Sequence, residues 1–298
     1  MIASQLVSVV MCVYNGERFL NEQIESILNQ TYSFFEFLIL DDQSTDSSFN
    51  IIVNYAKKDS RIRYSRNDEN IGFNRNFEKG LQLSTGDLIA ISDQDDVWLN
   101  TKLECLVNNI HDNLLIYSNS VCIDEFGTML DIKLNHNIIH VDKPTYKSFL
   151  NDNFITGHTC LFKKALLNVA LPFPVNIFFY DWWLGFCASY VGNVGYIERV
   201  LTHYRIHSES VMQTFTESKI QRFKKVAQLN EFAASFFIKE DDRKFINELM
   251  SKKMSAKNDP FSFFACYRFL YKHHEQIYPW YKKSIIKKIN FLRKQCLK

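Results

Sequence analysis

The first hundred residues alternate short apolar runs with longer segments of helical period, and this alternation narrows the fold more than any other feature. The expected strands are 6–13, 35–42, 62–65 and 87–92, and the expected helices between them are 17–30, 47–58 and 73–83. Strands that alternate with helices form a largely parallel sheet with helices on its faces. We therefore expect an α/β fold in this part of the chain.

The rest of the chain divides into a looser stretch and a helical one. Strands are expected at 114–123, 154–162 and 193–204, with a helix that begins near Asp181. Thr101 and Glu104 have the spacing of a capping box and predict another helix start. From about 217 onward the pattern is helical, with breaks near 258–260 and 278–279. We expect a main domain over 1–216 and a helical C-terminal region over 217–298.

Composition places the chain among globular proteins. Its 298 residues are 46% hydrophobic, enough for one large core or a domain with an appendage. No apolar stretch approaches the roughly 20 residues of a membrane-spanning helix, and the N-terminus lacks the features of a signal peptide. We therefore expect a cytoplasmic protein. The seven cysteines contain no Cys-x-x-Cys pair, which argues against a disulfide framework or a zinc site and for reduced, buried thiols.

Charge is unevenly distributed along the chain. Residues 219–298 carry 19 Lys and Arg against 7 Asp and Glu, a net of +12, and the remainder carries 16 against 26, a net of −10. Within the basic region, 278–298 alternates Lys or Arg with Ile, Phe and Leu at roughly helical spacing. This pattern is typical of a basic amphipathic helix on an anionic membrane. A helix that packs its apolar face on the protein or on a partner subunit is the alternative.

Polar clusters follow three of the expected strands. They are Tyr14-Asn15-Gly16, Asp41-Asp42 and Asp93-Gln94-Asp95-Asp96. Each lies at the carboxyl end of its strand, the edge at which open α/β sheets bind ligands. The sequence therefore predicts one site that is built from residues far apart in the chain.

The acidic residues of these clusters suit a nucleotide diphosphate. Asp93 and Asp95 can approach a divalent cation from a turn, and Mg²⁺ favours one or two carboxylates together with substrate phosphates. Asp41 and Asp42 can accept hydrogen bonds from a nucleobase or from ribose hydroxyls. An acidic turn that caps a helix is the alternative for the first pair, and a turn with an N-cap is the alternative for the second.

Four segments follow one another along the chain: SVVMCVYNGERFLNEQIESILNQTY, LILDDQSTDSS, NDENIGFNRNF and GDLIAISDQDDVW. In this order they resemble the family 2 glycosyltransferases, whose catalytic domain has the Rossmann-like nucleotide-diphospho-sugar transferase fold called GT-A. Some segments are similar to the rhamnosyltransferase branch of that family. They are SDQDDVW and NIGFNRNFE, together with the later FFYDWWLGF and LTHYRIHSESV. The resemblance covers roughly residues 6–212.

The resemblance implies a role for each matching position. Asp181 matches the base, and Trp182 and Trp183 beside it would raise its pKa by desolvation; an N-cap of helix 182–190 is the alternative. The metal, Mg²⁺ or Mn²⁺, would be held by Asp95, Asp93 and His207. The donor would be bound by Tyr14, Asn15, Asp41, Asp42, Arg75, Asp93 and Gln94. Arg75 could equally be a solvated helix residue, and His207 a structural hydrogen-bonder. Many relatives carry Glu before the base where this chain has Tyr180, which leaves the acceptor contacts open.

The implied reaction is inverting, metal-dependent transfer of a sugar, rhamnose from dTDP-rhamnose, to a glycan or lipid-linked glycan precursor of a bacterial surface polysaccharide. A UDP-hexose donor at the same site is the alternative. A phosphatase with an Asp-x-Asp motif is an alternative from another class, but such an enzyme carries its nucleophile near the first strand, whereas the motif here begins at Asp93. A nucleotidyltransferase would carry a Gly-rich loop after the first strand, which VYNGERF lacks. A non-catalytic nucleotide- or carbohydrate-binding protein stays open. We expect no nucleic acid partner and possible attachment to the inner face of the membrane.

Overall fold

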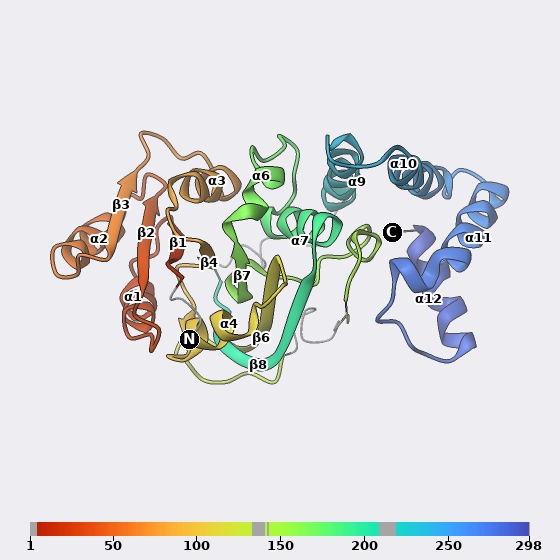
Figure 1. Cartoon of the computed structure of the whole chain (residues 1–298). Helices are drawn as coiled ribbons and strands as arrows, with labels where there is room; N and C mark the ends of the chain where they lie inside the picture. The colour runs from red at the N-terminus through yellow and green to blue at the C-terminus, as the bar shows by residue number, and fades with distance from the viewer. Residues whose placement is uncertain (1–4, 133–140, 142, 209–218, 298) are drawn as a thin grey trace.

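The computed structural model describes residues 5–132, 141, 143–208 and 219–297, with side chains of the last stretch described from Val226 onward. Its centre is an eight-stranded sheet in the order β3-β2-β1-β4-β7-β6-β8-β5 (Figure 1). The strands are β1 (Val7–Val13), β2 (Phe35–Asp41), β3 (Ile62–Arg66), β4 (Leu88–Ser92), β5 (Val97–Trp98), β6 (Leu115–Ile123), β7 (Cys160–Lys163) and β8 (Val194–Arg205). The α/β fold expected from the sequence is confirmed.

The sheet is mixed, with a parallel half formed by β1 to β4. β1 pairs in parallel with both β2 and β4, and β2 pairs in parallel with β3. β7 is antiparallel to β4 and β6, and β5 is antiparallel to β8. The register sets Val13 beside Asp41 and Met11 beside Ser92. The segments that follow β1, β2 and β4 therefore emerge together at one edge of the sheet.

Helices cover both faces of the sheet and bury alternate strand residues. One face packs against α1 (Leu20–Leu28), α2 (Ser48–Ala56) and α4 (Lys102–Asn109), and the other against α3 (Phe73–Leu83) and α7 (Tyr180–Val191). Val9 faces the first group and Val10 the second, as the period of two in a strand requires. At Gly80 of α3 an added Cβ would lie 2.5 Å from Val10 Cγ1, so only glycine lets this helix approach the sheet so closely.

Two local expectations are corrected by the structure, and one strand was missed. Of the expected strand 154–162 only the end is a strand, because the short helix η2 (Gly157–Thr159) precedes β7. Thr101 is the N-cap of α4 but makes no side-chain cap, and Glu104 instead accepts a hydrogen bond from Thr31 Oγ1 at 2.8 Å. The two-residue strand β5 was not expected. The remaining short elements are η1 (Tyr146–Phe149), η3 (Lys164–Leu166) and α6 (Leu167–Ala170).

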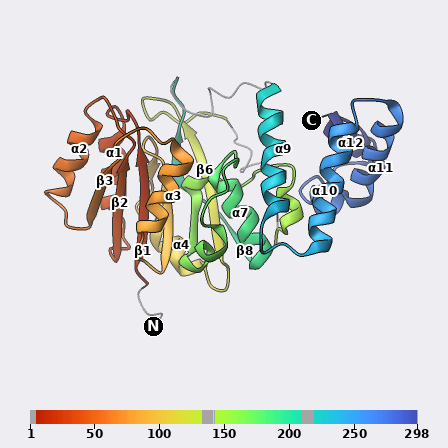
Figure 2. The ribbon, with the colours of Figure 1, turned by 90° about the horizontal axis from the view of Figure 1, so that it is seen from above.

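The C-terminal region consists of helices, as expected, and it shares its core with the sheet domain. Its helices are α9 (Lys219–Ala234), α10 (Glu240–Ser255), α11 (Pro260–Ile277) and α12 (Ile285–Leu297). α10 to α12 lie at the end of the molecule opposite β3 and α2 (Figures 1 and 2). Phe232 of α9 stacks on Phe186 of α7 with ring centroids 3.8 Å apart. Among the described residues, no helix combines the length and apolarity needed to cross a bilayer. All seven cysteines are free, and all but Cys12 are buried.

Candidate active site

Gln94 joins the loops that follow β1 and β4. Its Oε1 accepts a hydrogen bond from the backbone N–H of Tyr14 at 2.8 Å, and its Nε2 donates to the Tyr14 carbonyl at 3.1 Å. A Cβ at Gly16 would lie 2.6 Å from Gln94 Oε1. The side chain of Tyr14 itself is 47% exposed. Tyr14 and Gln94, both predicted to contact the donor, are therefore in contact at the edge of the sheet where β1 and β4 end.

Asn15 connects the loop after β1 to the loop after β2. It adopts a positive φ of 50°, a conformation that Asn tolerates better than most residues. Its Oδ1 accepts from the backbone N–H of Thr45 at 2.8 Å, and its own N–H donates to Ser44 Oγ at 3.0 Å. Asn15 therefore fixes the position of the Ser-rich turn.

The two aspartates at the end of β2 are both buried and differ in their partners. Asp42 accepts hydrogen bonds from Asn67 Nδ2 at 2.7 Å and from the backbone N–H groups of Ile71 and Gly72 at 3.0 and 2.9 Å. Asp41 Oδ2 pairs with Arg66 Nε at 3.1 Å, whereas Asp41 Oδ1 is buried without a hydrogen-bond partner among the described residues. Asp41 therefore keeps an acceptor that a ligand could use.

Arg75 lies on α3, on the face of the sheet that α3 and α7 cover, and forms contacts with neighbouring residues there. Its guanidinium forms an ion pair with Glu78 and donates to the carbonyl of Phe173 at 2.8 Å. Its side chain is 37% exposed. A contact between Arg75 and a donor would require this pair to open or to share the guanidinium.

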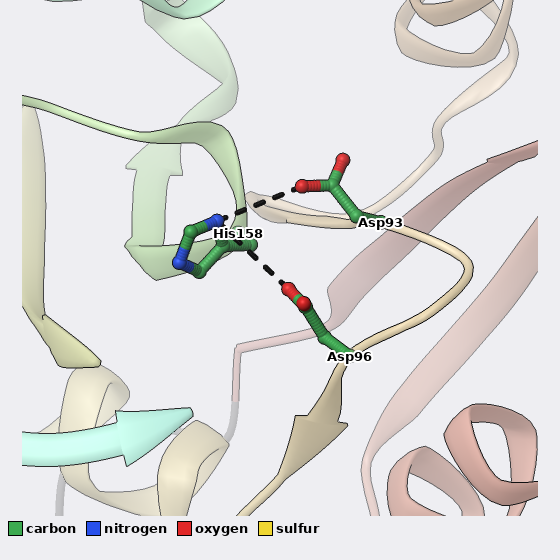
Figure 3. Close-up of side chains that lie close together, drawn as sticks. All are labelled: Asp93, Asp96 and His158. Atoms are coloured by element: carbon green, nitrogen blue, oxygen red, sulfur yellow. Dashed lines mark ion pairs between the residues drawn. The ribbon is translucent and has the colours of Figure 1, made fainter. Parts of the chain in front are cut away.

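The acidic turn after β4 faces a histidine from η2. His158 Nδ1 lies 3.6 Å from Asp93 Oδ2 and 3.8 Å from Asp96 Oδ2 (Figure 3). Asp96 is fully buried; its Oδ1 accepts from the backbone N–H of Arg205 at 3.1 Å, and its Oδ2 has no hydrogen-bond partner among the described residues. Ligand atoms of the two aspartates and the histidine lie within 4.8 Å of one another.

Asp95 turns to a different partner, on the segment that follows β8. Its Oδ2 lies 2.8 Å from His207 Nε2, and its carbonyl accepts from Arg205 Nε at 2.8 Å. The His207 ring packs on Phe19 with centroids 4.8 Å apart. The three residues predicted to hold a metal are thus divided: Asp95 contacts His207, and Asp93 contacts His158.

The donor set at this turn fits a divalent cation. Carboxylate oxygens suit Mg²⁺ and Mn²⁺, and imidazole is a further ligand for transition metals. Asp96 Oδ2, which accepts no hydrogen bond from the described residues, is a buried acceptor of the kind that a cation would satisfy. Burial raises the pKa of Asp96, and the nearby charges of Asp95 and Asp93 raise it further. A cation at the turn would reverse this repulsion.

Lys102 is a buried lysine that interacts electrostatically with the acidic turn. Its ammonium donates to Thr202 Oγ1 at 2.8 Å and to the carbonyl of His158, and it lies 3.6 Å from the ring centroid of Trp98. Burial lowers the pKa of Lys102, and the charge of Asp96 opposes that change. Nothing in the sequence marks Lys102, because its neighbours on α4 give it the pattern of an ordinary helix start.

Asp181 lies in the first turn of α7 as the acceptor of three hydrogen bonds. Its Oδ1 accepts hydrogen bonds from Asn153 Nδ2 at 2.9 Å and from the backbone N–H of Trp182 at 2.7 Å. Its Oδ2 accepts one from the backbone N–H of Gly157 at 3.1 Å. Burial raises the pKa of Asp181 to about 7, and these hydrogen bonds oppose the rise. The N-cap of α7 is Phe179, so the N-cap alternative for Asp181 is wrong.

The sequence did not indicate Asn153 and Gly157, and it gave His158 no role. A Cβ at Gly157 would lie 2.1 Å from Tyr180 Oη, which explains the need for glycine beside this helix start. Gly157 and His158 lie in the segment 154–162 that was expected to be a strand, and Asn153 directly precedes it. Strand periodicity carries no information about contacts with a distant helix.

The sequence was compared with known families and proteins. The family described as Glycosyl transferase family 2 matches residues 8–170, more than half of the chain. An uncharacterized glycosyltransferase of Methanocaldococcus jannaschii is 33% identical over 215 residues, which cover 67% of this chain and 71% of that protein. One of Haemophilus influenzae is 32% identical over 171 residues, 57% of this chain and 66% of that protein. WfgD of Escherichia coli is named a UDP-Glc:alpha-D-GlcNAc-diphosphoundecaprenol beta-1,3-glucosyltransferase. It is 30% identical over 186 residues, which cover 59% of this chain and 68% of that protein.

Solved structures share the fold at low sequence identity. Staphylococcus aureus TarS 1–349, in complex with UDP-GlcNAc, superposes with a TM-score of 0.64 at 15% identity and covers 97% of this chain and 88% of that one. The mannosyltransferase PcManGT of Pyrobaculum calidifontis, in complex with GDP-Man and Mn²⁺, gives a TM-score of 0.60 at 13% identity. The match covers 99% of this chain and 86% of that one. The chain therefore has a mixed α/β, GT-A-like fold, belongs to glycosyl transferase family 2 and is a glycosyltransferase.

Proposed function

We propose that this glycosyltransferase works with inversion and that Asp181 is its base. The observation that carries the proposal is the buried carboxyl of Asp181, whose pKa is raised to about 7, close to the value that suits a base at neutral pH. The acceptor oxygen forms its bond to the anomeric carbon while the bond from that carbon to the diphosphate oxygen breaks. The hydroxyl proton passes to Asp181, and attack opposite the leaving group inverts the configuration.

The donor would bind where β1, β2 and β4 end. We assign Tyr14, Asn15, Asp41, Asp42 and Gln94 to the nucleoside pocket, with Asp93 beside the ribose and Arg75 at the base or phosphates. The support is their common edge and the buried Asp41 Oδ1, to which none of the described residues donates a hydrogen bond. Asp42, with three N–H partners, would hold the pocket wall in place.

A divalent cation, Mg²⁺ or Mn²⁺, would be held at the acidic turn. Asp95 and His207, whose ligand atoms are 2.8 Å apart, are our first choice together with Asp93; Asp93, Asp96 and His158 form the alternative set. When bound, the ion would stabilise the charge on the departing diphosphate. Mn²⁺ binding followed by electron paramagnetic resonance separates the sets, since Asp95→Ala should weaken binding if the first is right and Asp96→Ala if the second is.

For the sugar, we propose rhamnose from dTDP-rhamnose, supported by the segments SDQDDVW, NIGFNRNFE and FFYDWWLGF. Glucose from UDP-glucose is the second candidate, because WfgD uses that donor. The acceptor would be a lipid-linked glycan precursor of a surface polysaccharide. We assign residues 1–216 to catalysis, with 217–298 as a helical region that braces α7.

The test is release of nucleoside diphosphate from a panel of dTDP-, UDP- and GDP-sugars, with Mg²⁺, Mn²⁺ or EDTA. Asp181→Asn should abolish turnover while calorimetry still detects donor binding. Turnover that survives Asp181→Asn would remove Asp181 as the base. A donor preference for UDP-glucose over dTDP-rhamnose would replace the rhamnose proposal.

A further inference from the structure

The first turns of α12 expose large apolar side chains to solvent. Ile285 is 63% exposed, Ile286 70% and Ile289 43%. Single exposed apolar residues are ordinary on protein surfaces, but a cluster of them marks an interaction site. Lys282 and Lys283, both exposed, come directly before this cluster.

The packing of α12 does not require these isoleucines. The helix is attached through its later turns, where Leu292 and Cys296 are buried. Phe291 adds a stacked contact with Tyr281 at a centroid distance of 3.9 Å. The first turns are held to α11 by a contact between Lys288 Nζ and His274 Nε2 at 2.7 Å. Because Ile285 and Ile286 remain exposed there, polar residues would serve the fold equally well at 285 and 286.

The same segment carries uncompensated positive charge. Residues 276–298 contain seven Lys and Arg and no Asp or Glu. On α10, by contrast, Lys244 and Lys252 each pair with a glutamate one turn away. Among the described residues no acidic side chain pairs with Lys282, Lys283 or Lys287. These charges therefore face solvent together with the isoleucines.

We propose that this α12 surface, formed by Lys282, Lys283, Ile285, Ile286 and Ile289, docks on an anionic lipid bilayer. The isoleucines enter the boundary between headgroups and acyl chains, and the lysines contact lipid phosphates. A second copy of the chain fits the surface less well, because the cores of protein interfaces are depleted in lysine. The inference goes beyond the proposed function, since lipid binding requires neither donor nor base.

The experiment is flotation of the full chain with vesicles, in the absence of donor and metal. Vesicles of phosphatidylcholine alone are compared with vesicles that contain about one third phosphatidylglycerol. The protein should float with the anionic vesicles, and salt should weaken this binding. Lys282→Gln with Lys283→Gln should lower the partition coefficient about 30-fold. Ile285→Asn with Ile286→Asn should lower it about tenfold or more.

The matched control is Lys57→Gln with Lys58→Gln, two exposed lysines at the end of α2, which should bind as the native chain does. Equal loss in this control would overturn the proposal, because the whole positive charge and not the α12 surface would then bind lipid. Equal flotation with neutral vesicles, or no flotation with either kind, would also overturn it. So would a dimer in sedimentation velocity that the isoleucine variant dissociates. Thermal unfolding confirms that each variant is folded, and donor turnover measured separately shows whether the proposed chemistry stands.

Discussion

The pKa of Asp181 gives a quantitative prediction about pH. A base must be ionised to accept a proton, so turnover should fall as the pH drops through the pKa of about 7. With that pKa, about one carboxyl in eleven is ionised at pH 6 and about ten in eleven at pH 8. We therefore expect kcat, measured as nucleoside diphosphate release at saturating donor and acceptor, to rise about tenfold between these pH values.

Asn153→Ala tests whether Asp181 causes that rise. It removes the hydrogen bond from Asn153 Nδ2 to Asp181 Oδ1, and a hydrogen bond to a charged group contributes about 1.5–3 kcal/mol. At 1.36 kcal/mol for each pKa unit, the midpoint of the kcat profile should move upward by about one to two units. Asn290→Ala, at an exposed position of α12, is the control that should leave it in place. A midpoint that does not move in Asn153→Ala would refute the assignment of the profile to Asp181.

Three further perturbations follow from the structure. His207→Ala should weaken Mn²⁺ binding and raise the Mn²⁺ concentration that gives half-maximal turnover, because Asp95 would lose its imidazole neighbour; an unchanged Mn²⁺ titration would contradict this. Lys102 has a pKa in the folded state below its unfolded value of about 10.4. Between these two pKa values the unfolded chain binds more protons than the folded chain, so the free energy of unfolding of the native chain should rise with pH relative to that of Lys102→Met. Urea titrations of both chains at pH 7 and 9.5 measure this difference. Free energies of unfolding that change equally in the two chains would contradict it. Gly80→Ala should lower the free energy of unfolding by about 1–3 kcal/mol, because the new methyl would meet Val10; an unchanged urea midpoint would show that α3 can shift away.

The parts of the fold that depend on local periodicity could be predicted from the sequence. The expected helix 73–83 coincides with α3, and the expected strand 35–42 differs from β2 by one residue. The strand ends placed the clusters around Asn15, Asp42 and Asp93 at one edge, which the register confirms. Each of these conclusions requires only the apolar pattern and the rule that parallel strands end together.

Contacts between distant segments could not be predicted in the same way. His158 lies 62 positions from Asp96 in the chain, and no periodic signal links the two. Lys102 is buried only because Trp98, Thr202 and η2 enclose its ammonium. The division of the acidic turn between His158 and His207 likewise depends on where β8 and η2 come to lie, so the residue types indicated a metal site without fixing its members.

Helix α7 lies in the sheet domain and also packs against the helical C-terminal region. Its first turn presents Asp181, and its middle stacks Phe186 on Phe232 of α9. A chimaera that took its C-terminal region from a relative would therefore repack the helix on which Asp181 sits. Attempts to recombine such enzymes should place the junction so that α7 and α9 come from the same parent, because a junction between them would separate two halves of one core.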